Sequence, residues 1–259
     1  MNRERWKSRF DATEGKTAPW PCPTCEQTLT VAPGTVHFQE SRGSREAQSH
    51  PAWEPEWIDR RFTCMLTCSC GESIAALGRQ GVEQSPDPSM DDFFNNYEDV
   101  SEPLFFHPAL RLISIPLAVP DSVREQLEQS FALFWSDTGS CANRIRASVE
   151  RLLDHLGVKR THVTKEGKRG YMSPHARIEL FRKAGGSLSH ELMALKWLGN
   201  AGSHTSPIVR DDLLDGYEIM EHVLREVFEQ PAKRIARIAR TINRTKKPRS
   251  VSSRTRRRT

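Results

Sequence analysis

The sequence predicts a mainly α-helical protein with a small β-rich module at its N-terminal end and a basic, partly disordered tail. Three observations favour this fold class. Five of the six cysteines lie between positions 22 and 70, helical periodicity starts after Pro120, and the last part of the chain is rich in Lys and Arg. We therefore expect an N-terminal module, a connector, a helical bundle and a tail, at residues 1–81, 82–119, 120–231 and 232–259.

Charge and hydropathy predict a cytoplasmic protein that binds a polyanion. Residues 1–16 lack the apolar core of a secretory signal, and no apolar run approaches the roughly 20 residues of a membrane span. Residues 233–259 hold twelve Lys and Arg and no acid, whereas residues 1–232 hold 26 basic and 33 acidic residues, a formal charge of −7. We expect the segment from Lys233 to Arg258 to bind RNA or DNA through its phosphates, without sequence preference, and we expect no membrane contact.

The cysteines predict a structural metal site in the N-terminal module. Cys22-Pro-Thr-Cys25 forms one close pair, and three further thiols follow in "CMLTCSCGE". Disulfides are rare in the cytoplasm, so close cysteine pairs there are typical metal ligands. Four thiolates form the tetrahedral set that suits Zn²⁺ and leave no position open for water. We therefore expect a structural zinc in a zinc-ribbon-like module, whose small antiparallel sheet comes from residues 29–38 and 62–67.

The second cysteine pair is ambiguous, because Cys64, Cys68 and Cys70 allow more than one choice. Gly71 directly follows Cys70, and a turn whose backbone N–H groups point at sulfur needs a conformationally permissive residue there. We assign the zinc to Cys22, Cys25, Cys68 and Cys70, with Cys64 as the alternative ligand.

Residues 82–105 are acidic, rich in Pro and Ser, and show no clear period, which is typical of a connector. After it, caps, apolar stripes and stop signals predict five helices with short connections, as in a helical bundle. A further helical period in the first part of the tail runs through Ile235, Ile238 and Ile242. The predicted bundle helices start at Asp121, Ser140, Ser173-Pro174, Leu188 and Asp211.

The segments "ANRIRASVERLLDHLGV", "LMALKWLGNAGSH" and "DDLLDGYEIMEHVL" resemble the domain of unknown function family DUF4145. That family is similar to the HEPN helical domains of bacterial toxin, abortive-infection and restriction systems. The resemblance implies a HEPN-like helical bundle that forms a homodimer. Active HEPN domains are metal-independent ribonucleases whose motif joins an Arg, a polar residue and a His a few residues further on.

The chain departs from that motif. If His204 is the motif His and Asn200 the polar residue, Gly199 stands where the Arg is expected. His204 would be the general base, because the unperturbed pKa of a histidine side chain lies near neutrality. The cation that holds the developing phosphate charge would have to be Lys196, Arg144 or Arg146. The catalytic candidates are therefore His204, Asn200, Lys196 and Arg144. Gly199 and Gly202 are also expected to let another helix approach closely.

Three functions follow from these features. The missing Arg favours a HEPN-like module that binds nucleic acid, above all RNA, in a bacterial defence, restriction or stress system. The alternative is a metal-independent endoribonuclease with an altered motif. A second alternative is a protein-interaction adaptor, which would leave the basic tail without a role.

Overall fold

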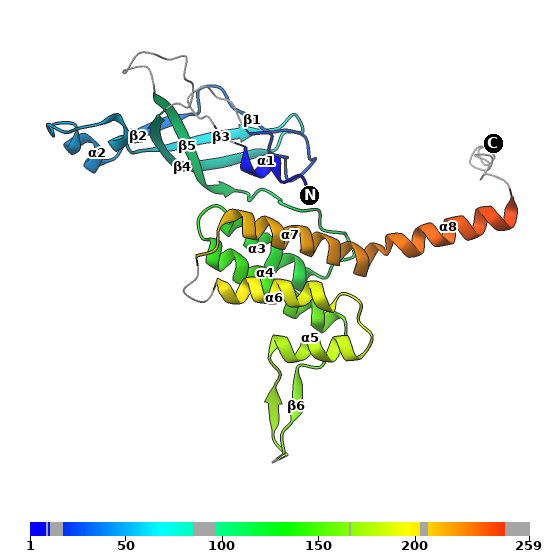
Figure 1. The fold of residues 1–259 in the computed structure, drawn as a ribbon. Helices are drawn as coiled ribbons and strands as arrows, with labels where there is room; N and C mark the ends of the chain where they lie inside the picture. Colours follow the sequence, from blue (N-terminus) through cyan, green and yellow to red (C-terminus); the bar gives the residue numbers. More distant parts are fainter. Residues whose placement is uncertain (9, 11–17, 85–96, 166, 203–206, 247–259) are drawn as a thin grey trace.

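An antiparallel sheet and a helical bundle pack against each other in the computed structural model of the chain (Figure 1). The structure describes residues 1–8, 10, 18–84, 97–165, 167–202 and 207–246. None of the described helices combines the length and the apolar character needed to cross a membrane.

The sheet is built around three long strands, β3 (Arg60–Thr67), β4 (Ser73–Gln84) and β5 (Tyr97–His107), each antiparallel to the next. Two short strands, β1 (Thr30–Val31) and β2 (His37–Glu40), pair with different parts of β3. Alternate side chains of β3 and β4 are buried, as expected for a sheet with one face on the core. Short helices α1 (Glu4–Lys7), α2 (Arg42–Ala47) and η1 (Pro55–Trp57) complete this module.

Strand β5 corrects the sequence prediction in two respects. Residues 97–107 were expected to be a connector without regular structure, but they pair with β4 from Ala75↔His107 to Gln84↔Tyr97. Residues 82–84 belong to β4 and not to a connector. The sheet is therefore larger than expected, and the chain is mixed α/β and not mainly α-helical.

The bundle contains the five helices expected from the sequence, but the connection between the second and the third is not short, because it holds a hairpin. The Ser173 hydroxyl caps the third of them, and Gly157, at φ +74°, follows the end of the second. Three starts differ from the prediction. The second helix begins at Thr138, before Ser140, and Asp137 caps it, while the fourth and fifth begin at Ser189 and Arg210, next to the expected Leu188 and Asp211. The helices are α3 (Asp121–Leu133), α4 (Thr138–His155), α5 (Pro174–Lys183), α6 (Ser189–Ala201) and α7 (Arg210–Leu224), which continues as a π-helical turn, η2 (Arg225–Glu229).

Aromatic side chains hold the sheet and the bundle together. Trp20 lies near the first cysteine pair, Phe106 on β5 and Trp135 just after α3; their ring centroids are 5.1–5.5 Å apart. The N-terminus reinforces this contact, because the Met1 ammonium pairs with Glu221 of α7 at 2.7 Å. Buried side chains of the two parts therefore form one continuous core.

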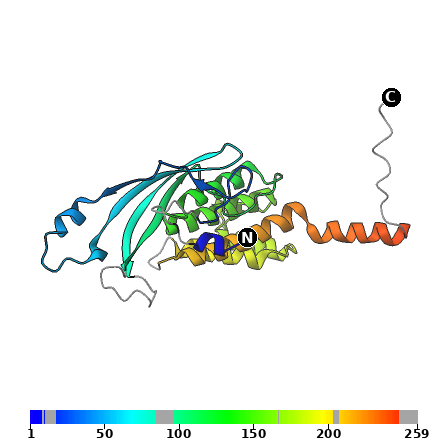
Figure 2. The ribbon, with the colours of Figure 1, turned by 90° about the horizontal axis from the view of Figure 1, so that it is seen from above.

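Two elements project from this body in different directions (Figure 1). One is a hairpin of β6 (Thr161–Val163) and β7 (Arg169–Tyr171), inserted between α4 and α5. The other is α8 (Pro231–Thr245), which extends from the end of the bundle as a single helix (Figure 2). At about 1.5 Å per residue, α8 is about 22 Å long.

Candidate metal centre and basic surfaces

The four cysteines assigned from the sequence meet at one point of the N-terminal module. Each pair of their sulfur atoms lies within 4.8 Å. Cys22 Sγ is 3.7 Å from Cys70 Sγ, and Cys25 Sγ is 3.4 Å from Cys68 Sγ. A tetrahedral zinc with Zn–S distances of about 2.3 Å separates its sulfurs by about 3.8 Å. The donor set and its size therefore fit a tetrahedral metal ion.

The backbone around these thiols has the form of two metal-binding knuckles. The N–H of Thr24 donates to Cys22 Sγ at 3.4 Å, and the backbone of Gln27 makes the same kind of bond to Cys25. In the second turn, the Cys70 and Glu72 backbones bond to Cys68 and Cys70. Each thiol thus receives an N–H from the residue two positions later, an arrangement that favours the thiolate.

The pKa of Cys68 shows the effect of this arrangement. It falls to about 7, chiefly because the Cys70 backbone N–H donates to its sulfur. The pKa values of Cys25 and Cys70 are instead raised, that of Cys25 to about 12, because the backbone hydrogen bonds from Gln27 and Glu72 are outweighed by burial and the neighbouring thiols. Metal ligation needs thiolates, so a lowered thiol pKa reduces the cost of binding a metal at neutral pH.

A left-handed residue follows each cysteine pair. Gly71, after Cys70, has φ +93°, which confirms the permissive position expected there. The equivalent position after Cys25 is held by Glu26 at φ +64°, a conformation that a non-glycine residue adopts at a cost. The two turns therefore share a backbone geometry although only one of them has the glycine.

Cys64 is not part of the thiol cluster. It lies inside β3 opposite Ala76 and is almost fully buried, so burial raises the pKa of its thiol to about 11. Cys64 and Leu66 lie on the buried face of β3, whereas Cys68 directly follows the strand, where the chain turns. Cys64 therefore serves as a small core residue.

The two glycines of the α6 segment lie where α6 crosses α4. A Cβ on Gly199 would be 2.3 Å from Arg146 Cβ and 2.9 Å from the Ala142 carbonyl oxygen. A Cβ on Gly202 would be 2.6 Å from the Gly139 carbonyl oxygen. All three distances are shorter than real Cβ contacts, so these glycines permit the close helix approach that the sequence predicted.

The catalytic candidates lie only partly within the described structure. His204 falls in residues 203–206, outside the described residues, and Asn200 lies half-buried near the end of α6. Lys196 is buried; burial and then the nearby Arg146 lower its pKa, and its Nζ lies 3.1 Å from the centre of the Trp197 ring. Arg146 of α4 is therefore a second cation beside Lys196.

Arg144 lies toward a different helix. Its Nη1 donates to Gln126 Oε1 of α3 at 3.1 Å, whereas Arg146 packs on Gly199 of α6. Arg146 also pairs with Glu150, four residues later in α4, at 2.5 Å. The structure thus does not bring Arg144 together with Lys196 and Asn200.

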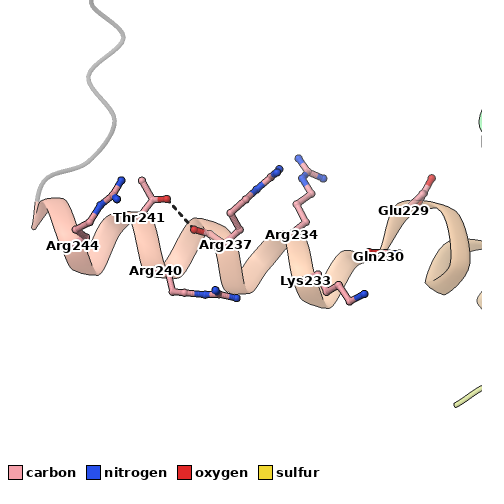
Figure 3. Close-up of a pocket in the computed structure, with 8 residues that line it drawn as sticks. All are labelled: Glu229, Gln230, Lys233, Arg234, Arg237, Arg240, Thr241 and Arg244. Atoms are coloured by element: carbon pink, nitrogen blue, oxygen red, sulfur yellow. Dashed lines mark hydrogen bonds between the residues drawn. The ribbon is translucent and has the colours of Figure 1, made fainter. Parts of the chain in front are cut away.

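Helix α8 carries a basic face and no acid of its own; Glu229, just before the helix, pairs with Arg225. At about 100° per residue its five Lys and Arg fall within one arc of about 120°, and its three isoleucines fall on the opposite side. These isoleucines are 43–65% exposed, and no residue of α8 is buried. Within the described part of the chain none of the five cations forms an ion pair. Figure 3 shows their side chains reaching away from the helix: Lys233, Arg234, Arg237, Arg240 and Arg244.

Sequence reasoning missed a second basic element, the β6–β7 hairpin. Residues 159–171 contain five Lys and Arg and one acid, a signal that was visible in the sequence. The strands are three residues long, too short to show a period, so no hairpin was predicted.

Two protein families match the chain. Residues 10–106 match the model of a domain of unknown function, DUF8608, which covers the cysteine knuckles and the sheet through β5. No curated protein and no solved structure matches. Residues 128–244 match the model of the domain of unknown function DUF4145, which confirms the predicted resemblance over the bundle and most of α8.

Proposed function

We propose that this protein binds nucleic acid, RNA in the first place, through the basic face of α8 and the tail that follows it. The observation that carries the proposal is α8 itself: a projecting helix with five cations on one face and no ion pair to any described acid. Elsewhere in the molecule Arg side chains commonly pair with acids, as Arg3 does with Asp215 and Arg210 with Glu102. Unpaired cations on an extended element suit a phosphate backbone.

The metal centre has a structural role in this proposal. Its ligands would be Cys22, Cys25, Cys68 and Cys70, and zinc is the ion that best suits four thiolates. A bound zinc would join the turn before β1 to the turn between β3 and β4, beside the aromatic contact that holds the sheet on the bundle. The setting in a bacterial defence, restriction or stress system rests on the DUF4145 resemblance alone.

Close packing at the α4–α6 crossing favours binding over the ribonuclease alternative. The position of the missing motif Arg, Gly199, faces α4 and has no room even for a methyl group. An Arg side chain at this position would have to enter the helix contact. The site that the HEPN motif would need is therefore filled by packing in this chain.

The test is a salt titration of binding to labelled RNA. Replacing Arg234, Arg237, Arg240 and Arg244 by Gln keeps helix-forming residues but removes four charges. We expect weaker binding and a slope of log K against log salt that is smaller by about 3. A matched control replaces four exposed arginines of the sheet module by Gln and should bind like the wild type: Arg42, Arg45, Arg61 and Arg79.

Two outcomes would contradict the proposal. One is unchanged affinity of the α8 variant for RNA and DNA at low salt. The other is binding to anionic vesicles without binding to nucleic acid, because a basic helix with an isoleucine stripe also suits a bilayer surface.

A further inference from the structure

We infer that the β6–β7 hairpin is a second nucleic-acid contact, one that recognises unpaired bases by stacking them on Tyr171. The inference rests on the proposed function and adds the class of ligand: single-stranded segments rather than duplexes. It depends on how the hairpin is mounted, on its uncovered face and on its charge.

The base of the hairpin is held firmly to the bundle. Arg177 of α5 is 4% exposed; its guanidinium donates to Asp154 Oδ1 at 2.7 Å and to the carbonyl oxygens of Val158 and Lys159, where the hairpin begins. Arg160 Nε donates to the same Asp154 oxygen at 2.6 Å. A buried, hydrogen-bonded mount of this kind fixes the direction in which the hairpin projects.

The free part of the hairpin exposes apolar side chains on one face. The register pairs Thr161 with Tyr171 and Val163 with Arg169, so these four side chains share a face. Tyr171 is 87% exposed and Val163 is 70% exposed. Since a two-stranded sheet alone is only marginally stable in water, large uncovered side chains here contribute little to the fold and are available to a partner.

The opposite face of the hairpin carries His162 and Gly170 in place of large apolar side chains. His162 lies over Gly170, since a Cβ on that glycine would be 3.0 Å from His162 Cε1. The ring thus covers the gap that the glycine leaves, and no large side chain projects from Gly170. The large apolar ring that the hairpin leaves uncovered is therefore Tyr171, and the exposed His162 ring lies against Gly170 on the other face.

The positive charge of the hairpin favours nucleic acid as its partner. Four exposed cations of the hairpin form no ion pair with any described residue, and Arg169 lies beside Tyr171 on the same face. An exposed aromatic ring next to a guanidinium is the arrangement on which unpaired bases stack, since every base has a π face. The four cations are Lys159, Lys165, Lys168 and Arg169.

The experiment compares two probes: a labelled oligouridylate and a labelled RNA duplex of the same length. Tyr171→Ala should weaken oligouridylate binding about tenfold and leave duplex binding unchanged. Tyr171→Phe, which keeps the ring, should bind both probes like the wild type. Circular dichroism should show no loss of fold, because Tyr171 is exposed.

The outcomes separate this inference from the proposed function. If Tyr171→Ala leaves oligouridylate binding unchanged, or weakens both probes equally, stacking on the hairpin is excluded while the role of α8 stands. If the α8 variant binds both probes like the wild type, the proposed function fails whatever the hairpin does.

Discussion

The cysteine cluster and α8 differ in how their side chains are arranged. In the cluster, four thiols converge to within 4.8 Å and each receives a backbone N–H. On α8, five cations share one face of a projecting helix and form no ion pair with a described acid. Converging donors specify a small ligand of defined geometry, whereas a row of exposed charges suits an extended polymer.

The difference has a consequence for stability. A bound metal would be part of the fold, because the two knuckles and the aromatic contact behind them depend on it. The cations of α8 are not part of any core, so the fold should not depend on them. Substitution of a metal ligand should therefore destabilise the fold, whereas substitution of the α8 cations should weaken nucleic-acid binding and leave the fold intact.

The largest expected effect follows from Cys22→Ser. Structural zinc binding is worth about 10 kcal/mol or more to the folded site. Loss of one thiolate should therefore release the metal and unfold the N-terminal module. Metal content of the purified protein and its thermal unfolding measure both effects. The quadruple α8 variant should keep the wild-type metal content and unfolding temperature.

Cys64→Ala is the matched control for the metal site. Because Cys64 lies in the core of β3 and outside the cluster, this variant should retain one metal per chain. Loss of the metal in Cys64→Ala would show that the ligand set is wrong.

The next effect concerns the α4–α6 crossing. Gly199→Ala should lower the free energy of unfolding by about 1–3 kcal/mol, because the added methyl group overlaps Arg146 and the Ala142 carbonyl. Gly199→Arg should destabilise the protein more and should not create ribonuclease activity. Chemical denaturation and an RNA cleavage assay without metal test the two statements.

Gly43→Ala provides the comparison. Gly43 also lies in a helix, α2, but nothing lies within 4 Å of a Cβ added there. This variant should be neutral or more stable, by up to about 1 kcal/mol. Equal effects at Gly43 and Gly199 would mean that close packing is not the reason for Gly199.

Local signals in the sequence predicted the bundle well and the sheet poorly. Ser173-Pro174 and Gly157 mark helix ends through their own chemistry, so the sequence alone places them. Strand β5 is acidic and contains Pro103, and it becomes a strand because β4 offers it an edge. That partner is separated from β5 in the sequence by residues 85–96, and no local pattern reveals the pairing.

The candidate site shows the same division. Two cysteine pairs and Gly71 were enough to choose the four converging thiols, because knuckle chemistry is local. Arg144 points toward α3 and not toward α6, because of the way the helices cross. The spacing of residues in the sequence does not predict that crossing. For the same reason Arg146, and not Arg144, is the cation beside Lys196.

A smaller loss of stability is expected at the base of the β6–β7 hairpin. Asp154→Asn should cost about 1–3 kcal/mol, because Arg177 is buried and would lose its charged partner. Burial opposes ionisation of Asp154, but hydrogen bonds from Arg160 and Arg177 outweigh it and lower the Asp154 pKa. A lowered folded-state pKa means that this stability is present above the unfolded value of 3.8 and is lost as pH falls through the folded value.

Urea unfolding at two pH values measures this effect. The difference between wild type and Asp154→Asn should be full near neutral pH and should shrink below about pH 3.8. Arg151→Ala is the control, because the Arg151 pair with Asp154 is long, at 3.8 Å, and half exposed. A difference that stays constant across this pH range would contradict the role given to the Asp154 carboxylate.

The smallest effect compares the two knuckles directly. Gly71→Ala should destabilise the metal-bound protein by about 1 kcal/mol, because the space around Gly71 is open and only the left-handed backbone opposes a side chain. Glu26→Gly should do the reverse: it relieves the strain at φ +64°, although the freer unfolded chain offsets part of the gain. We therefore expect Glu26→Gly to raise the free energy of unfolding by less than about 1 kcal/mol, with metal content unchanged in both variants. Thermal unfolding with the metal bound measures both, and a loss of stability in Glu26→Gly would mean that Glu26 contributes a contact that outweighs its backbone strain.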